Sequence, residues 1–219
     1  MKRLFLALIA FSATYAAEAQ IVSSTSKTIT SHTTAETVVV PDEPTVYKNY
    51  NRFSLNYASL HYGDVELDSS TFPGFEVAWD HANNLSKGKK LPIYLEWGIH
   101  LQYNAKNISY GYWNYYEEET YRHLEIAIPF SVTYKFMLND FYAAPFFGLH
   151  FKSACLDDLA DDLESQKYFQ MGYQVGANLG YKKLNFQIGY SGDFMPVCET
   201  WDDEGIKTGT FFVGLGVNF

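Results

Sequence analysis

Histidines and hydroxyl-bearing residues are the first side chains of this chain to consider for nucleophilic catalysis, and histidines also for metal binding. Nucleophilic catalysis needs a nucleophile within reach of a base, and a zinc site needs ligands at characteristic spacing. The six histidines are scattered, and no His-x-Ser pair falls on any of the alternating segments described below. We therefore predict no catalytic residue, no metal ligand and no cofactor.

Charged residues recur at alternate positions of several segments, so each set shares one face of an extended chain. Inside a small barrel these faces would meet, because such an interior is just wide enough for side chains to fill it. We predict a lumen charge network of Arg52, Glu76, Glu96, Glu125 and Lys135, with Asp80, His100, His150 and Lys152 on the same faces. The alternative is a narrow channel along these groups.

Aromatic residues are concentrated in residues 105–122, between two of the alternating segments. Tyr and Trp are typical hot-spot residues of recognition surfaces. We predict a candidate recognition loop made by Tyr110, Tyr112, Trp113, Tyr115 and Tyr116, followed by the acidic run 117–119. The alternative is that these rings extend an aromatic girdle at a membrane interface.

A second connection, residues 156–168, is acidic and also carries leucines at helical spacing. The pattern favours a short surface helix with a solvated acidic face. Divalent cations that bridge its carboxylates to anionic lipopolysaccharide are the alternative. The acidic residues are Asp157, Asp158, Asp161, Asp162 and Glu164.

The chain has two cysteines, Cys155 and Cys198, each placed just after an alternating segment. Both are expected at the same end of the barrel, and we predict that they can form one disulfide. Two free thiols are the alternative, because the Cα separation that a disulfide requires cannot be read from a sequence.

The segment 169–181 indicates which structure positions these residues. Its odd positions are apolar or aromatic and its even positions are Gly, Gln or Asn, a strict period of two over thirteen residues. This is the pattern of a β-strand with one apolar face. Soluble strands have about five or six residues, whereas a tilted strand needs roughly nine to eleven to cross a bilayer. The segment is therefore predicted to be a lipid-facing membrane strand.

Seven further segments alternate in the same way, at residues 52–58, 75–80, 93–104, 124–136, 141–152, 184–191 and 211–219. An even number of strands lets an antiparallel barrel close with both ends of the chain on one side. We predict an all-β, eight-stranded antiparallel up-and-down transmembrane β-barrel. Short connections at 137–140 and 182–183 mark the periplasmic end, and longer ones mark the outer end. A secreted soluble barrel with its apolar rows turned inward around a ligand is the alternative.

The N-terminus predicts export. Lys2 and Arg3 precede an apolar run, and Ala17-Glu18-Ala19 fits a cleavage site, so residues 1–19 are predicted to be a signal peptide. Residues 20–49 are rich in Ser and Thr and are predicted to form a flexible periplasmic segment, followed by the barrel at 50–219. No other apolar run is long enough for a membrane-spanning helix. The net charge of −9 argues against nucleic acid as a partner.

Residues 50–219 resemble the small outer-membrane β-barrel family of Bacteroidetes type, which is related in architecture to OmpX-like and PorT-like proteins. The resemblance lies in Leu124-Glu125-Ile126 with Pro129, in Tyr134-Lys135-Phe136, and in the last segment, 212–219. In this chain the Pro comes two residues later than in the family pattern. A terminal residue such as Phe219 looks like the signal that the barrel-insertion machinery reads.

These observations predict a non-enzymatic barrel, present as a monomer in the outer membrane of a Gram-negative bacterium. It would contact membrane lipid and lipopolysaccharide and present its outer loops for envelope integrity or surface interaction. A lipid-modifying enzyme, which in barrels of this size uses Ser and His near the outer rim, is the alternative.

Overall fold

The computed structural model describes residues 48–63, 71–86, 91–112, 115–158, 169–199 and 205–219. Its long strands are β1 Tyr50–Tyr62, β2 Thr71–Asn84, β3 Ile93–Tyr112, β4 Tyr115–Tyr134, β6 Phe141–Asp157, β7 Phe169–Tyr181, β8 Leu184–Asp193 and β11 Thr208–Asn218. Three short strands are β5 Phe136–Leu138, β9 Cys198–Glu199 and β10 Gly205–Ile206. Within the described ranges, no helix has the length and apolar character needed to cross a membrane.

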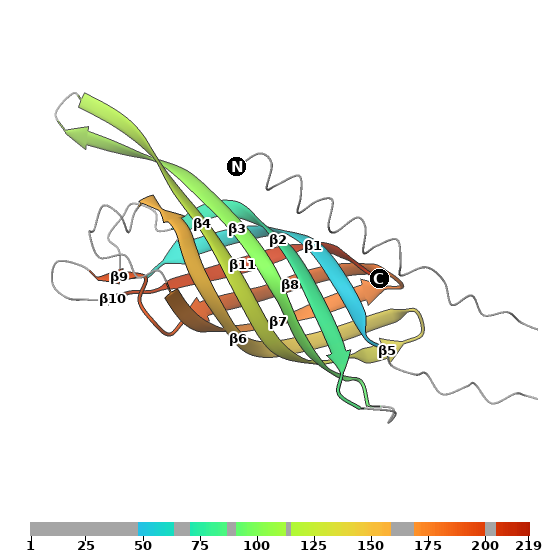
Figure 1. Ribbon diagram of the computed structural model, residues 1–219. Helices are drawn as coiled ribbons and strands as arrows, with labels where there is room; N and C mark the ends of the chain where they lie inside the picture. Colours follow the sequence, from blue (N-terminus) through green and yellow to red (C-terminus); the bar gives the residue numbers. More distant parts are fainter. Residues whose placement is uncertain (1–47, 64–70, 87–90, 113–114, 159–168, 200–204) are drawn as a thin grey trace, which may run out of the picture. The chain divides into compact units, whose positions relative to one another are not determined.

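The long strands close into a barrel (Figure 1). Each pairs antiparallel with the next one along the chain, β4 pairs with β6, and β11 returns to pair with β1. The wall therefore has eight strands and no open edge at its middle. The predicted fold class is confirmed.

The two faces of the wall differ sharply in polarity, as the alternation in the sequence predicts. Leu55 and Leu215 on the outside are 56% and 70% exposed, whereas Asn56 and Gln170 on the inside are both 1% exposed. A row of exposed apolar side chains is stable only against lipid. The apolar rows thus face the membrane, and the alternative of a soluble barrel with these rows turned inward is wrong.

The two ends of the barrel differ in their connections. At the turn end, β5–β6 and β7–β8 are joined by tight turns in which Asn139 and Lys182 have positive φ angles of 55° and 53°. At the opposite end, here called the loop end, longer connections join β1 to β2, β6 to β7 and β8 to β11, whereas only residues 113–114 join β3 to β4. Arg52 near the start of β1 lies opposite Asn218 at the end of β11. The first strand of the wall therefore begins at the turn end, and the last strand ends there.

Two local features differ from the sequence prediction. Residues 105–122 are largely paired strand rather than loop, because β3 and β4 each have 20 residues and continue as a hairpin. Pro129 keeps its regular place opposite His150, and the register between β4 and β6 does not shift there. A β-bulge lies instead where Leu124 faces Leu156 and Glu125 faces Ala154, which leaves Cys155 as an extra residue in β6.

Candidate functional site

The turn-end half of the lumen contains five side chains joined by ion pairs, the turn-end ion cluster: Arg52, Glu76, Asp80, Glu96 and His100. The guanidinium of Arg52 lies 2.8 Å from Asp80 and 2.9 Å from Glu96. The ring of His100 bridges Asp80 at 3.0 Å and Glu76 at 3.2 Å. Because β1, β2 and β3 are neighbours in exact register, their inward positions bring these groups together.

The loop-end half contains a second set of paired groups, the loop-end ion cluster: His123, Glu125, His150, Lys152, Asp157 and Asp193. The ammonium of Lys152 lies 3.1 Å from Glu125 and 2.9 Å from Asp193. His123 contacts Glu125 at 2.9 Å and Asp157 at 3.1 Å, and the hydroxyl of Thr208 donates to Asp193. Buried charges are tolerated when they are paired and hydrogen-bonded in this way.

The two ion clusters are separated by a cavity of only about 20 Å³. Glu76 and His100 line it from one side, and Glu125, His150 and Lys152 line it from the other. A volume of this size holds roughly one water molecule. The side chains that line this cavity therefore leave room for about one water molecule between the two clusters.

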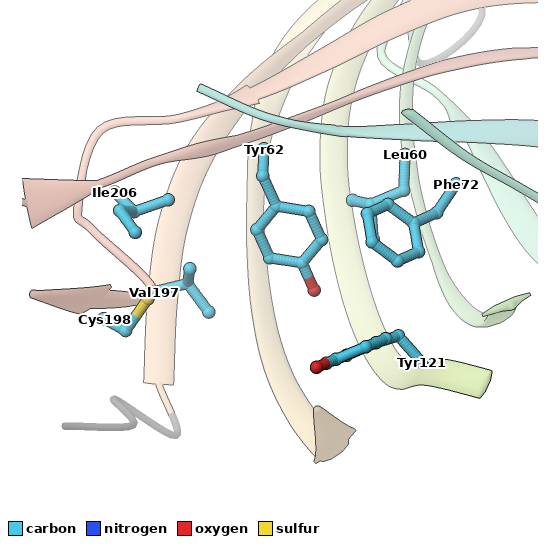
Figure 2. Packing of buried hydrophobic residues seen from close by; sticks show 7 residues of the cluster. All are labelled: Leu60, Tyr62, Phe72, Tyr121, Val197, Cys198 and Ile206. Carbon is cyan, nitrogen blue, oxygen red and sulfur yellow. The ribbon is translucent and has the colours of Figure 1, made fainter. Parts of the chain in front are cut away.

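The loop end is closed by an apolar cluster, shown in Figure 2. Its members are Leu60, Tyr62, Phe72, Tyr121, Val197, Cys198 and Ile206, with Ile108 packed against them. The amide of Val197 donates to the carbonyl of Ile206 at 2.7 Å within the β9–β10 segment. The amide of Gly63, just after β1, donates to the carbonyl of Lys207 at 2.8 Å and ties the segment to the end of β1. The described part of this segment thus packs against β1, β2 and β4 at the loop end.

Next to the turn-end ion cluster, the lumen is occupied by Tyr142 and its partners. The hydroxyl of Tyr142 donates to Asn185 at 3.0 Å and accepts from Asn218 at 2.6 Å. Gly180 lies beside the Tyr142 ring, where any Cβ would collide with it, so this glycine makes room for the ring. Above the ring lies the ammonium of Lys135, 4.1 Å from the centroid of Tyr142 and 4.6 Å from that of Tyr50.

The predicted lumen network is thus divided among three places. Arg52, Glu76 and Glu96 lie together in the turn-end ion cluster, and Glu125 lies in the loop-end ion cluster. Lys135 contacts aromatic rings, with cation–π geometry.

Of the predicted recognition residues, Tyr110, Tyr112, Tyr115 and Tyr116 belong to the paired hairpin of β3 and β4. Their side chains and the whole of Trp113 lie outside the described residues. The predicted signal peptide, residues 20–47 and the acidic residues Asp161, Asp162 and Glu164 also lie outside them.

No disulfide joins the two cysteines in the structure. Cys155 is exposed at the bulge of β6, whereas Cys198 is fully buried in the apolar cluster. The two side chains therefore occupy different environments, on the outside and on the inside of the barrel.

Three residues of the loop-end ion cluster were not assigned to the lumen from the sequence. His123 lies two positions before Glu125, and Asp193 lies two positions after Ser191, so each continues the polar alternation of its strand. Extending the two alternating segments by two residues would have predicted both. Asp157 could not be found in this way. The bulge at Cys155 changes the phase of the alternation, and only with that extra residue does Asp157 face the lumen.

A closed antiparallel wall, an apolar outer face and a lumen filled by paired charges define a small transmembrane β-barrel protein. No family model matches the chain, and no curated protein matches it. Membership of the Bacteroidetes-type family therefore stays a prediction.

Several solved structures have a similar fold. One is Ail, the attachment invasion locus protein of Yersinia pestis, which is 11% identical over 78% of this chain and 97% of its own, with a TM-score of 0.39. Neisserial surface protein A is 14% identical over 78% and 97%, with a TM-score of 0.41. The outer membrane protein OprG from Pseudomonas aeruginosa is 9% identical over 78% and 96%, with a TM-score of 0.40. Similarity of this degree concerns the fold alone.

Proposed function

We propose that the chain is a non-enzymatic barrel of the outer membrane of a Gram-negative bacterium, and that it acts in recognition at the cell surface. The membrane location is supported by the outward apolar rows and by aromatic pairs near both ends of the wall. These pairs are Tyr134–Phe136 and Phe141–Tyr181 at the turn end, and Phe75–Tyr103 and Tyr173–Tyr190 toward the loop end. Aromatic girdles of this kind mark the two interfaces of a bilayer.

The observation that carries the role is the length of the β3–β4 hairpin. Among the described residues, β2 accompanies β3 only as far as Asn104, and β6 accompanies β4 only as far as His123. Beyond these points β3 and β4 pair with each other alone, and in Figure 1 their ends project past the other strands. Each outer edge of the hairpin therefore presents backbone groups that neither β2 nor β6 pairs with.

An exposed strand edge is a template for an added strand, in which main-chain hydrogen bonds supply affinity and side chains supply specificity. Glu118 and Glu119 are exposed beside the edge of β4, next to the acidic Glu117. The partner that fits this edge is an extended, basic polypeptide segment. The aromatic residues of the hairpin would add contact area.

The test uses cells that display the full chain and a fluorescent, lysine-rich peptide that alternates basic and β-branched residues. We expect binding to the full chain, and loss of binding when residues 108–119 are replaced by Asn-Gly, a two-residue hairpin turn. N-methylation of the alternate amides on the peptide edge that pairs with the hairpin should abolish binding. N-methylation of the amides on the other edge of the peptide should leave binding intact. Equal binding of the two methylated peptides would show that charge alone attracts the peptide.

Deletion of residues 64–70, another loop-end connection, serves as the control and should leave peptide binding intact. Heat-dependent migration in detergent gels should show that both variants fold. If the purified full chain instead hydrolyses or transfers lipid acyl chains, and loses this activity when a Ser or His at the rim is changed, the binding role is wrong and the enzyme alternative holds.

The other partners follow from the membrane location. Lipid would contact the apolar rows, and lipopolysaccharide would meet the acidic loop end through divalent cations. Phe219 would be read by the barrel-insertion machinery, so its removal should lower the yield of inserted protein in cells without changing the stability of protein that is refolded in detergent.

A further inference from the structure

The small cavity between the two ion clusters contains an unusual group, the ring of His150. This residue is only 3% exposed. Its Nε2 lies 2.9 Å from Oδ1 of Asp193, while its Nδ1 has no hydrogen-bond partner in the protein. His150 also lines the cavity, so the unpartnered nitrogen belongs to a side chain at the cavity wall.

A buried ring nitrogen without a hydrogen bond is unfavourable, and buried polar groups that lack a protein partner are generally satisfied by ordered water. Because a carboxylate only accepts, Nε2 of His150 is the nitrogen that donates to Asp193. In the neutral ring Nδ1 is then an acceptor that needs a donor. A protonated ring would need an acceptor at the same place.

The surroundings of the cavity decide what kind of molecule fits. The charges of Glu76 and His100 are paired with each other on one side, and those of Lys152 and Glu125 on the other. A further ion would therefore compete with oppositely charged partners that already lie within 3.2 Å of these groups. A neutral molecule that both donates and accepts suits this lining, and the volume of about 20 Å³ admits one such molecule of the size of water.

We propose that the cavity is a binding site for one water molecule, which hydrogen-bonds to Nδ1 of His150 and joins the turn-end and loop-end ion clusters into one network. Each ion cluster comes from its own set of strands, β1, β2 and β3 for the turn-end cluster and β4, β6 and β8 for the loop-end cluster. The bound water links the two clusters across the middle of the barrel. A substitution in one cluster therefore alters the effect that a substitution in the other cluster has on stability.

A crystal structure of the full chain, at a resolution that shows ordered water, tests occupancy. The expected result is one peak about 2.7–3.2 Å from Nδ1 of His150. An empty cavity overturns the proposal. So does an anomalous signal at this position in crystals soaked with bromide or rubidium, because it would assign the site to an ion.

A double-mutant cycle tests the link. Glu76→Gln changes one cluster and Lys152→Met changes the other, and unfolding equilibria are measured in detergent for both single variants and the double variant. We expect a coupling of roughly fivefold in the unfolding equilibrium constant. Ala127→Val adds two methyl groups at the cavity wall and should displace the water and abolish the coupling.

Ala144→Val is the matched control. Ala144, on β6, faces the lumen of the barrel but does not line the cavity. It should alter stability and leave the coupling in place. Absence of coupling in the parent chain, or a coupling that persists in the Ala127→Val background, overturns the proposal. In the second case, direct electrostatic interaction would be the link.

Discussion

The hydroxyl of Tyr62 lies 2.9 Å from Oδ1 of Asp157 and donates a hydrogen bond to it. The ring of the same tyrosine packs edge-on against Phe72 in the apolar cluster, with centroids 5.2 Å apart. One side chain thus belongs both to the apolar mouth of the barrel and to the buried charges beneath it. We therefore expect a substitution in the apolar layer to affect the stability of the charged layer, and the reverse.

Replacing Tyr62 by Phe separates these two contributions. The ring stays in the apolar cluster, but Asp157 loses a donor, and hydrogen bonds to charged groups contribute about 1.5–3 kcal/mol. We expect a loss of this size in the free energy of unfolding, measured by urea titration in detergent. Tyr57→Phe, on the exposed outer face, is the control and should change this free energy by less than about 0.5 kcal/mol. Equal effects of the two variants would contradict the prediction.

Arg52→Met should be among the most damaging changes in the turn-end ion cluster. It removes the cation that lies between Asp80 and Glu96 and leaves both carboxylates buried without it. Breaking a buried ion pair from one side costs about 3–5 kcal/mol. The triple variant with Asp80→Asn and Glu96→Gln should regain most of this stability in the same urea titration. Arg122→Met, at an exposed pair with Asp158, should have little effect.

Purified protein in planar bilayers should show no steady conductance. The lumen holds paired charges on both sides of a cavity of about 20 Å³, and an apolar cluster covers the loop end. A hydrated ion needs a continuous wider path than this. Steady currents that change in Glu96→Gln or Lys135→Gln would contradict the prediction and favour the channel.

The two cysteines should differ in reactivity. In folded protein, N-ethylmaleimide should modify Cys155, which is exposed, and leave Cys198 unmodified, because that thiol is buried in the apolar cluster. After unfolding without reductant, mass spectrometry should find both thiols modified. A chain with no reactive thiol under these denaturing conditions would instead carry the disulfide that the sequence suggested.

Period-two alternation was sufficient to predict the wall of the barrel. In residues 169–181 every second residue is apolar, and β7 has the same bounds in the structure. The same pattern placed Arg52, Glu76 and Glu125 on the polar face, because burial follows directly from the phase of the alternation. It could not show which charges touch, since partners such as Arg52 and Glu96 are on strands that do not pair with each other.

The ends of the strands were the least predictable part. Residues 105–122 are rich in Tyr and Glu and lack clear alternation, yet they continue β3 and β4 because backbone pairing between the two strands persists beyond the rest of the wall. The segment that closes the loop end was also not anticipated. Val197, Cys198 and Ile206 lie in a long connection without alternation, and only their packing against Leu60 and Phe72 gives them a common position.

The bulge in β6 has a consequence for how this chain can change in length. Cys155 is the extra residue, since Leu124 faces Leu156 and Glu125 faces Ala154 on either side of it. Deletion of Cys155 would give an unbroken alternation in β6. Ala154 and Asp157 would still be directed to the lumen, and Leu156 to lipid. In a regular stretch of the strand, a one-residue deletion would exchange the lipid and lumen faces of everything that follows. The exposed thiol therefore occupies a site where the wall tolerates the deletion of one residue, and barrels related to this one are expected to lack the bulged residue in some cases.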